Sequence, residues 1–160
     1  MTIDYFYVLA WLMAVCSGLM AGVYLTFSVV IMKSLATLSP SLGIDAMNAI
    51  NKVILKTAFM PLFFGTSVLA LVMIVASLWF QSESGAGTML TAGLIYFFGM
   101  FVSTAAINVP LNNKLAKVSG DGDEAQLVWQ EYLKRWTRWN TSRALWSFVT
   151  LVLCLDLLTR

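Results

Sequence analysis

The chain contains no histidine, and charged residues make up only 11% of its 160 positions. Histidine is the commonest protein ligand for zinc, copper and non-haem iron and the usual axial ligand of haem, so we expect neither a metal nor a haem cofactor. The two cysteines, Cys16 and Cys154, are too far apart in the sequence for a CxxC redox or zinc motif. We interpret them as small apolar side chains.

Apolar residues make up 59% of the chain, which is too high a fraction for a soluble domain of this size. A membrane-spanning helix needs about 20 predominantly apolar residues. Four apolar stretches predict transmembrane helices at residues 5–32, 57–80, 88–107 and 142–158. The sequence therefore predicts an all-α integral membrane four-helix bundle that forms a single membrane domain over residues 1–160.

Positive charge is concentrated in the two longer segments that join the predicted spans. Residues 33–56 contain three lysines, and residues 108–141 contain five lysines and arginines. By the positive-inside rule both segments are cytoplasmic loops and both termini lie outside, in an inner or plasma membrane. The net charge of +2 is thus a topology signal, and we predict no nucleic-acid partner.

A helical stripe of polar and aromatic residues precedes the last span. Asp123 or Glu124 begins a helix, because acidic residues favour the positive end of a helix dipole. From there a stripe with a spacing of three or four residues, with Trp139 beside it, contains Trp129, Tyr132, Trp136, Asn140 and Arg143. This pattern predicts an amphipathic helix before the last transmembrane helix, and alone it favours an interfacial position with the aromatic rings at headgroup level.

Two asparagines, Asn108 and Asn112, mark the predicted end of the third span, with Pro110 between them. Proline cannot donate a hydrogen bond to the carbonyl of Ala106, so the helix should be kinked or broken here. Polar side chains and broken backbone occur at membrane depth only where protein buries them or where they line a wet cavity. The motif either caps a kinked helix end or forms part of a pocket.

The other candidate pocket residues lie on the first two spans and the segment between them. Tyr24 and Ser28 close the first span, and Asn48 and Asn51 lie on an amphipathic helix that leads into the second.

Small residues form two further faces. Gly18 and Gly22 belong to a small-xxx-small ladder in the first span, and Gly93 and Gly99 form a similar face in the third. These faces leave room for a homo-oligomer.

Four segments together resemble a known family across nearly the whole chain. They are Gly22-Val-Tyr-Leu-Thr-Phe-Ser28, Ala46-Met-Asn-Ala-Ile-Asn51, Asn108-Val-Pro-Leu-Asn112, and the stripe from Trp129 through Trp139-Asn140 to Arg143. Their order and their placement relative to four apolar spans resemble the anthrone oxygenase-like family of small four-helix membrane proteins, most of whose members have no assigned function.

The resemblance implies oxidation of a polycyclic aromatic substrate by molecular oxygen, without metal or flavin, in a pocket at the cytoplasmic helix ends. Such chemistry requires that an acidic carbon lose a proton and that the resulting oxyanion be stabilised. The candidate oxyanion donors are Asn108, Asn112, Asn140 and Arg143, and the candidate stacking residues are Tyr132, Trp136 and Trp139. The general base is not identified: Glu124 and Glu131 would have to reach the pocket, and Tyr24 or Tyr132 would need a strongly lowered pKa.

A non-catalytic membrane module is the alternative, in which the same cluster binds lipid, a quinone-like ligand or a protein partner. Membrane lipids and an aromatic or quinone-like small molecule are the expected partners under the two hypotheses. A transporter or channel is less favoured, because the first three spans contain no Asp, Glu, Lys or His. The full candidate pocket comprises Tyr24, Ser28, Asn48, Asn51, Asn108, Asn112, Tyr132, Trp136, Trp139, Asn140 and Arg143.

Overall fold

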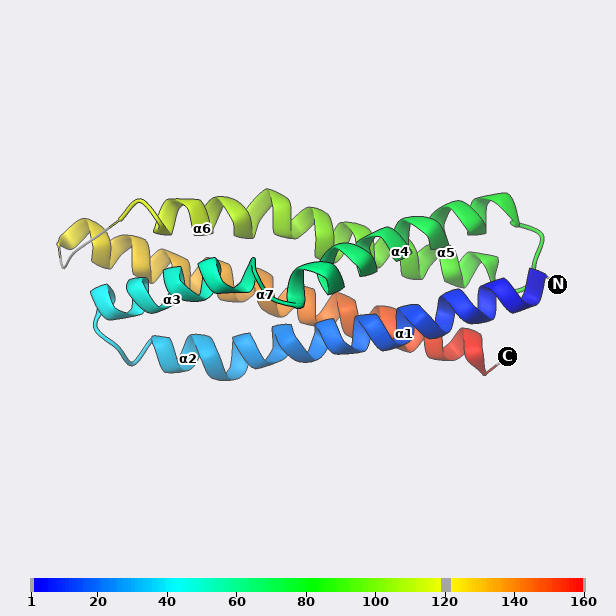
Figure 1. The fold of residues 1–160 in the computed structure, drawn as a ribbon, viewed down its shortest axis with the longest axis horizontal. Helices are drawn as coiled ribbons and strands as arrows, with labels where there is room; N and C mark the ends of the chain where they lie inside the picture. The colour runs from blue at the N-terminus through cyan, green and yellow to red at the C-terminus, as the bar shows by residue number, and fades with distance from the viewer. Residues whose placement is uncertain (1, 119–121, 160) are drawn as a thin grey trace.

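A computed structural model describes residues 2–118 and 122–159, with side chains from residue 5 onward. This part of the chain folds into α-helices and three π-helical segments, labelled η, and Figure 1 shows them as an elongated bundle with both termini at one end. The elements are α1 (Thr2–Thr26), η1 (Phe27–Ile31), α2 (Met32–Leu35), α3 (Pro40–Ile54), α4 (Phe59–Trp79), α5 (Ala86–Tyr96), η2 (Phe97–Val102), η3 (Thr104–Asn108), α6 (Val109–Leu115) and α7 (Asp123–Leu158).

Four helical stretches in the described residues are long and apolar enough to cross a membrane. They are Tyr5–Leu35, Phe59–Trp79, Ala86–Leu115 and Asp123–Leu158. Each helix satisfies its own backbone hydrogen bonds, which is what lipid requires of a spanning segment. The prediction of an all-α integral membrane four-helix bundle is confirmed.

The segments predicted as loops at 33–56 and 108–141 are largely helical, with residues 119–121 outside the described residues. Together with Met32, their apolar side chains form a second core that is separate from the core among the spans. This second core includes Ile44, Met47, Leu115 and Trp129. Burial of this second core stabilises α2, α3, α6 and the first turns of α7 as helices. We call this part of the bundle, opposite the two termini in Figure 1, the basic end.

The amphipathic helix predicted before the last span is present, but it continues into that span without a break. α7 has 36 residues and extends about 54 Å, well beyond the roughly 30 Å of bilayer hydrocarbon. No proline or glycine interrupts it. Trp129, Tyr132 and Trp136 are buried in the bundle, so their rings pack against protein and are not exposed on the helix surface.

The helix of the third span continues past residue 107, the predicted end of that span, through Pro110 to Leu115. Pro110 lacks the N–H that would bond to Ala106, and the widened turns of η2 and η3 lie immediately before it. These π-turns absorb the irregularity without ending the helix. Single π-turns within α-helices are frequent at functional sites, and all three segments lie where the two cores meet.

The small-residue face of the third span is used inside the bundle. A Cβ atom on Gly93 would lie 2.9 Å from the carbonyl oxygen of Ala70, and one on Gly99 would lie 2.7 Å from the Trp146 ring. These contacts bring α5 close to α4, and η2 close to α7. The homo-oligomer stays a prediction.

Replacement of Gly93 by alanine should destabilise the bundle, although alanine is normally the better helix former. The new methyl would meet a backbone oxygen that cannot move aside, at a cost of about 2 kcal/mol. Gly87 is on the same helix and has open space around its Cα, so Gly87→Ala should keep or raise stability. Thermal denaturation of both variants in one detergent checks this, and equal midpoints would contradict it.

Candidate functional site

A cavity of about 270 Å³ lies at the junction of the two cores. Its walls come from α1, η1, α3, α4, η2, η3, α6 and α7. Most of the surface is apolar and aromatic, including Phe27, Met47, Phe59, Phe63 and Phe101. All three π-helical segments contribute residues to the cavity wall, so the irregular turns and the cavity lie at the same level of the bundle.

Arg143 on α7 is the charged side chain in the cavity wall, and only 3% of it is exposed. Its Nη1 donates to Thr104 Oγ1 at 2.8 Å, and its Nη2 donates to Asn140 Oδ1 at 3.1 Å. The guanidinium carbon lies 4.6 Å from the centroid of the Tyr24 ring and 5.7 Å from that of Trp136. Neutral oxygens and two aromatic faces therefore hold this cation.

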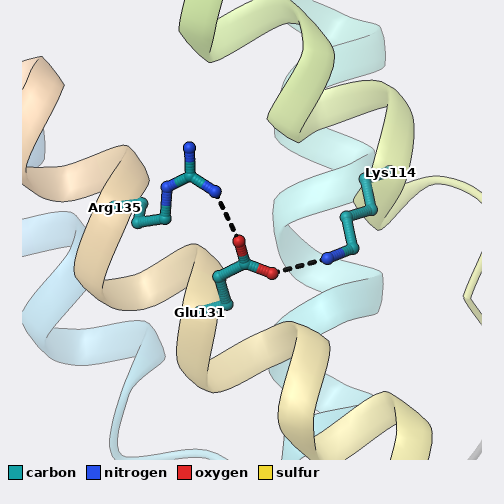
Figure 2. Close-up of polar contacts among 3 residues, drawn as sticks. All are labelled: Lys114, Glu131 and Arg135. Atoms are coloured by element: carbon teal, nitrogen blue, oxygen red, sulfur yellow. Dashed lines mark hydrogen bonds and ion pairs between the residues drawn. The ribbon is translucent and has the colours of Figure 1, made fainter.

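No acidic residue is among the described residues that line the cavity. The ion pairs found in the described chain join Glu131 to Lys114 and Arg135 on the surface of the basic end, as Figure 2 shows. Arginine keeps its proton in proteins, and a buried charge without an anionic partner costs several kcal/mol. The two cation–π contacts offset part of this cost, about 2 kcal/mol each for desolvated contacts. The cavity therefore has a positive potential that an anion would neutralise.

Asn140 connects α7 to the end of α1. Its Nδ2 donates to the carbonyl oxygen of Tyr24 at 2.6 Å and to Ser28 Oγ at 2.7 Å, while its Oδ1 accepts from Arg143. Thr141 Oγ1 lies 2.8 Å from the same Ser28 oxygen. Asn140 is buried, with 1% of its surface exposed. Its hydrogen bonds fix the orientation of Arg143 and join α7 to the end of α1.

Four buried polar atoms in the cavity wall have no hydrogen-bond partner. They are Asn51 Nδ2, Asn108 Oδ1, Trp136 Nε1 and Arg143 Nε. Nearly all buried polar atoms in folded proteins are bonded, so several unsatisfied atoms around one cavity indicate a place for a polar ligand or water. Three of the atoms are donors, which suits an oxygen-rich or anionic group.

Trp136 provides a flat wall that is braced from behind. Its ring stacks on Tyr132 at a centroid distance of 5.7 Å, and Tyr132 stacks on Trp129 at 5.9 Å. Tyr132 is fixed in turn by its hydroxyl, which donates to Asn112 Oδ1 at 2.7 Å. A planar ligand could lie against the part of the Trp136 ring that lines the cavity at little entropic cost, because Tyr132 and the Arg143 guanidinium already hold this ring in place.

Residues 54–153 match the family model described as anthrone oxygenase. The chain belongs to this family. No curated protein and no solved structure matches the sequence. The matched region extends from the end of α3 into the last turns of α7, so it contains Asn108, Trp136, Asn140 and Arg143. Tyr24, Ser28, Asn48 and Asn51 lie before it.

Most of the predicted pocket residues of this family member come together around the cavity. Those that line it are Tyr24, Asn51, Asn108, Asn112, Trp136, Asn140 and Arg143. Two more lie behind the cavity wall: Ser28 accepts a hydrogen bond from Asn140, and Tyr132 stacks on Trp136.

Two predicted residues do not line the cavity. Asn48 is half-buried on α3 and is not among the cavity residues, whereas Asn51 is. Trp139 is 36% exposed, because one residue along a helix is a rotation of about 100° away from Asn140.

The aromatic wall from α4 and η2 was not predicted from the sequence. Phe59 and Phe63 lie one turn apart on α4 with their rings stacked at 5.9 Å, and Phe101 packs against Phe63 at 5.6 Å. The signal was the repeated spacing of four in Phe59/Phe63 and Phe97/Phe101, which places each pair on one helical face. Thr104, which binds Arg143, was also missed.

The described residues offer no group of three or more Cys, Asp or Glu side chains that could hold a metal ion. Glu131, one of the candidate bases, is bound by Lys114 and Arg135 and is not a cavity residue. Glu124 is exposed near the start of α7. The Tyr24 hydroxyl lies 3.3 Å from Met100 Sδ and donates to it. Neither acidic residue reaches the cavity.

Proposed function

We propose that this protein oxidises the acidic CH₂ group of an anthrone-like polycyclic aromatic to a ketone with molecular oxygen, in the cavity around Arg143. One observation carries the proposal: a buried arginine lines an aromatic cavity in which no described lining residue is acidic. Membership of the anthrone oxygenase family supports the same chemistry. The orphaned donors of Asn51 and Trp136 support the binding of an oxygen-rich ligand.

The role of Arg143 is to make the substrate itself a stronger acid. When the CH₂ group loses a proton, the charge moves to the carbonyl oxygen as an enolate. A cation in a water-poor cavity stabilises that oxyanion far more than bulk water would, and it needs no reorganisation during the reaction. The proton passes to a water molecule at the polar side of the cavity, where buried atoms of Asn51 and Asn108 have no partner in the protein, so a carboxylate base in the wall is not required.

Oxygen then accepts the electrons that the enolate carries. The carbanion carbon forms a C–O bond with O₂ and, after protonation, becomes a hydroperoxide. Loss of the second C–H proton with cleavage of the O–O bond gives the C=O group and releases water. One oxygen atom enters the product and the other leaves as water, so the substrate is oxidised by four electrons and O₂ is fully reduced.

The remaining walls position the flat substrate. Trp136 supplies a rigid stacking face, and the phenylalanines of α4 and η2 exclude water from the opposite side. We further infer from the positive-inside rule that the basic end, and with it the cavity, faces the cytoplasm.

Binding without oxidation is the second candidate. The lack of an acidic side chain among the described cavity residues favours it, because no general base is supplied. In that case the cavity holds a hydroxylated aromatic or quinone-like molecule and releases it unchanged.

Oxygen consumption with dithranol, a dihydroxylated anthrone, separates the two candidates. Protein in lipid nanodiscs should speed oxygen uptake above the rate in empty discs, which measures spontaneous oxidation. With ¹⁸O₂ the quinone should gain one labelled oxygen at the former CH₂ carbon. Equal rates with and without protein, together with saturable binding of the compound, would assign the protein to the non-catalytic class.

A further inference from the structure

A second hollow, the α1 groove, follows the surface of the first span beside the cavity. It has a volume of about 840 Å³ and is lined from Ala14 to Ile31 on α1 and η1, with Ile50 of α3 above. Its lining is apolar except for Thr26, whose hydroxyl donates to the Gly22 carbonyl oxygen at 2.9 Å. The groove therefore presents hydrocarbon surface along a membrane-spanning helix.

The α1 groove and the cavity share a boundary. Val23, Phe27 and Ile50 line both spaces, so the two hollows meet at the level of η1. On the cavity side of this boundary are the unpartnered buried atoms of Asn108 and Arg143, whose side chains are at most 3% exposed. The two hollows thus lie side by side, one with a polar, cationic lining and the other with a lining that is apolar apart from Thr26.

We propose that the ligand of this protein is an amphiphile, with an acidic aromatic head in the cavity and a hydrocarbon chain in the α1 groove. This inference rests on the proposed function, since it takes the cavity as the site of the aromatic ring. It adds that the ligand is a membrane-dissolved molecule with an alkyl or isoprenoid chain, which enters sideways from the bilayer past Phe27.

The direction and length of the groove suit such a chain. From Val23 to Ala14 the groove runs about 14 Å along the helix, away from the basic end. That distance is close to half of the roughly 30 Å hydrocarbon thickness, and lipid chains lie parallel to spanning helices. A ligand held by its head at the cavity would therefore extend its chain toward the bilayer centre, which is the orientation of every membrane amphiphile.

Gly22 is a position at which a larger side chain can fill the groove without disturbing the rest of the protein. It is exposed, lines the groove, and a Cβ atom added there would meet nothing within 4 Å. Phenylalanine at this position would thus project into open groove space. Gly65 on α4 is also exposed with nothing within 4 Å, but it lines neither hollow. Gly65→Phe is therefore a matched control for the added ring.

The test compares the binding of danthron, a dihydroxylated anthraquinone that cannot turn over, with danthron carrying a dodecyl chain. Quenching of tryptophan fluorescence in nanodiscs gives both dissociation constants, corrected for partition into empty discs. The chain should tighten binding by about tenfold, a modest gain because groove contacts replace contacts with equally apolar lipid. Gly22→Phe should abolish that gain and leave danthron binding unchanged, and Gly22→Leu should reduce it. Gly65→Phe should keep it.

The outcomes separate this inference from the proposed function. If danthron binds but the chain adds nothing, or if Gly22→Phe and Gly65→Phe retain the same gain, the groove does not hold the chain and the inference is wrong, while the aromatic site stands. If neither compound binds the unmodified protein, both the inference and the proposed aromatic site are overturned. Unchanged danthron binding by Gly22→Phe also shows that the variant is folded.

Discussion

Arg143→Ala should lower the rate of dithranol oxidation by about 10²–10³-fold, as loss of one preorganised oxyanion donor does in other enzymes. The guanidinium is the only cation that lines the cavity among the described residues, and it is held 2.8 Å from Thr104 and 3.1 Å from Asn140. Without it the enolate would form in an apolar cavity with no compensating charge. The measurement is oxygen uptake in nanodiscs, with the rate in empty discs subtracted.

Arg138 provides the matched control for that substitution. It lies on the same helix and carries the same charge, but it is exposed and does not line the cavity. Arg138→Ala should therefore retain the full rate. Arg143→Lys should recover only part of it, because an ammonium group lacks the planar fork that reaches Thr104 and Asn140 together. Equal rates for the Ala variants at 138 and 143 would remove the arginine from the mechanism.

A loss of activity in Arg143→Ala should not result from unfolding, because removal of a buried, unpaired charge need not destabilise a protein. Arg143 gives up its hydrogen bonds and two cation–π contacts on mutation, but the protein also escapes the cost of keeping a cation out of water. We expect Arg143→Ala to unfold at a temperature near that of the unmodified protein. A lost activity with a retained melting temperature would then assign the residue to chemistry.

The spans were predictable from the sequence because lipid leaves few structures open to a chain. Backbone groups in hydrocarbon must bond within the helix, so a long uncharged run such as residues 57–80 has one solution. The limits of the helices were less predictable. The helix of the third span passes Pro110 and reaches Leu115 because the buried apolar residues of the second core stabilise it, and hydropathy does not report that core.

The polar half of the cavity was more accessible to sequence reasoning than the aromatic half. Asn140 and Arg143 continue the helical stripe of Trp129, Tyr132 and Trp136, so their spacing in the sequence places them on one face with the aromatic rings. A phenylalanine in a spanning helix costs nothing whether it faces lipid or a cavity. Phe63 is buried and Phe64 is 51% exposed, yet both line the cavity, and hydropathy alone does not separate them from lipid-facing residues.

Asn140→Leu should lower the free energy of unfolding by about 3 kcal/mol, a larger loss than any surface substitution gives. Leucine has the same branched skeleton of side-chain heavy atoms and is somewhat larger, so it leaves no cavity and the loss comes chiefly from hydrogen bonds. The Asn140 amide bonds Tyr24 at 2.6 Å and Ser28 at 2.7 Å, and its oxygen accepts from Arg143. After the substitution the arginine keeps its charge but loses one of its two acceptors, and α7 keeps only the Thr141 hydrogen bond to Ser28 of those described between it and η1.

We expect Asn140 to stabilise the bundle and its neighbour Arg143 to act on the ligand. Asn113 lies at an exposed position on α6, so Asn113→Leu is the control for replacement of an asparagine by leucine. This variant should unfold at the same temperature as the unmodified protein. If Asn140→Leu unfolds at the same temperature as Asn113→Leu, the Asn140 hydrogen bonds do not hold the helices together. If Asn140→Leu is destabilised and Arg143→Ala is not, Asn140 stabilises the bundle. Arg143 then has no structural role and is the group that would bind a ligand anion.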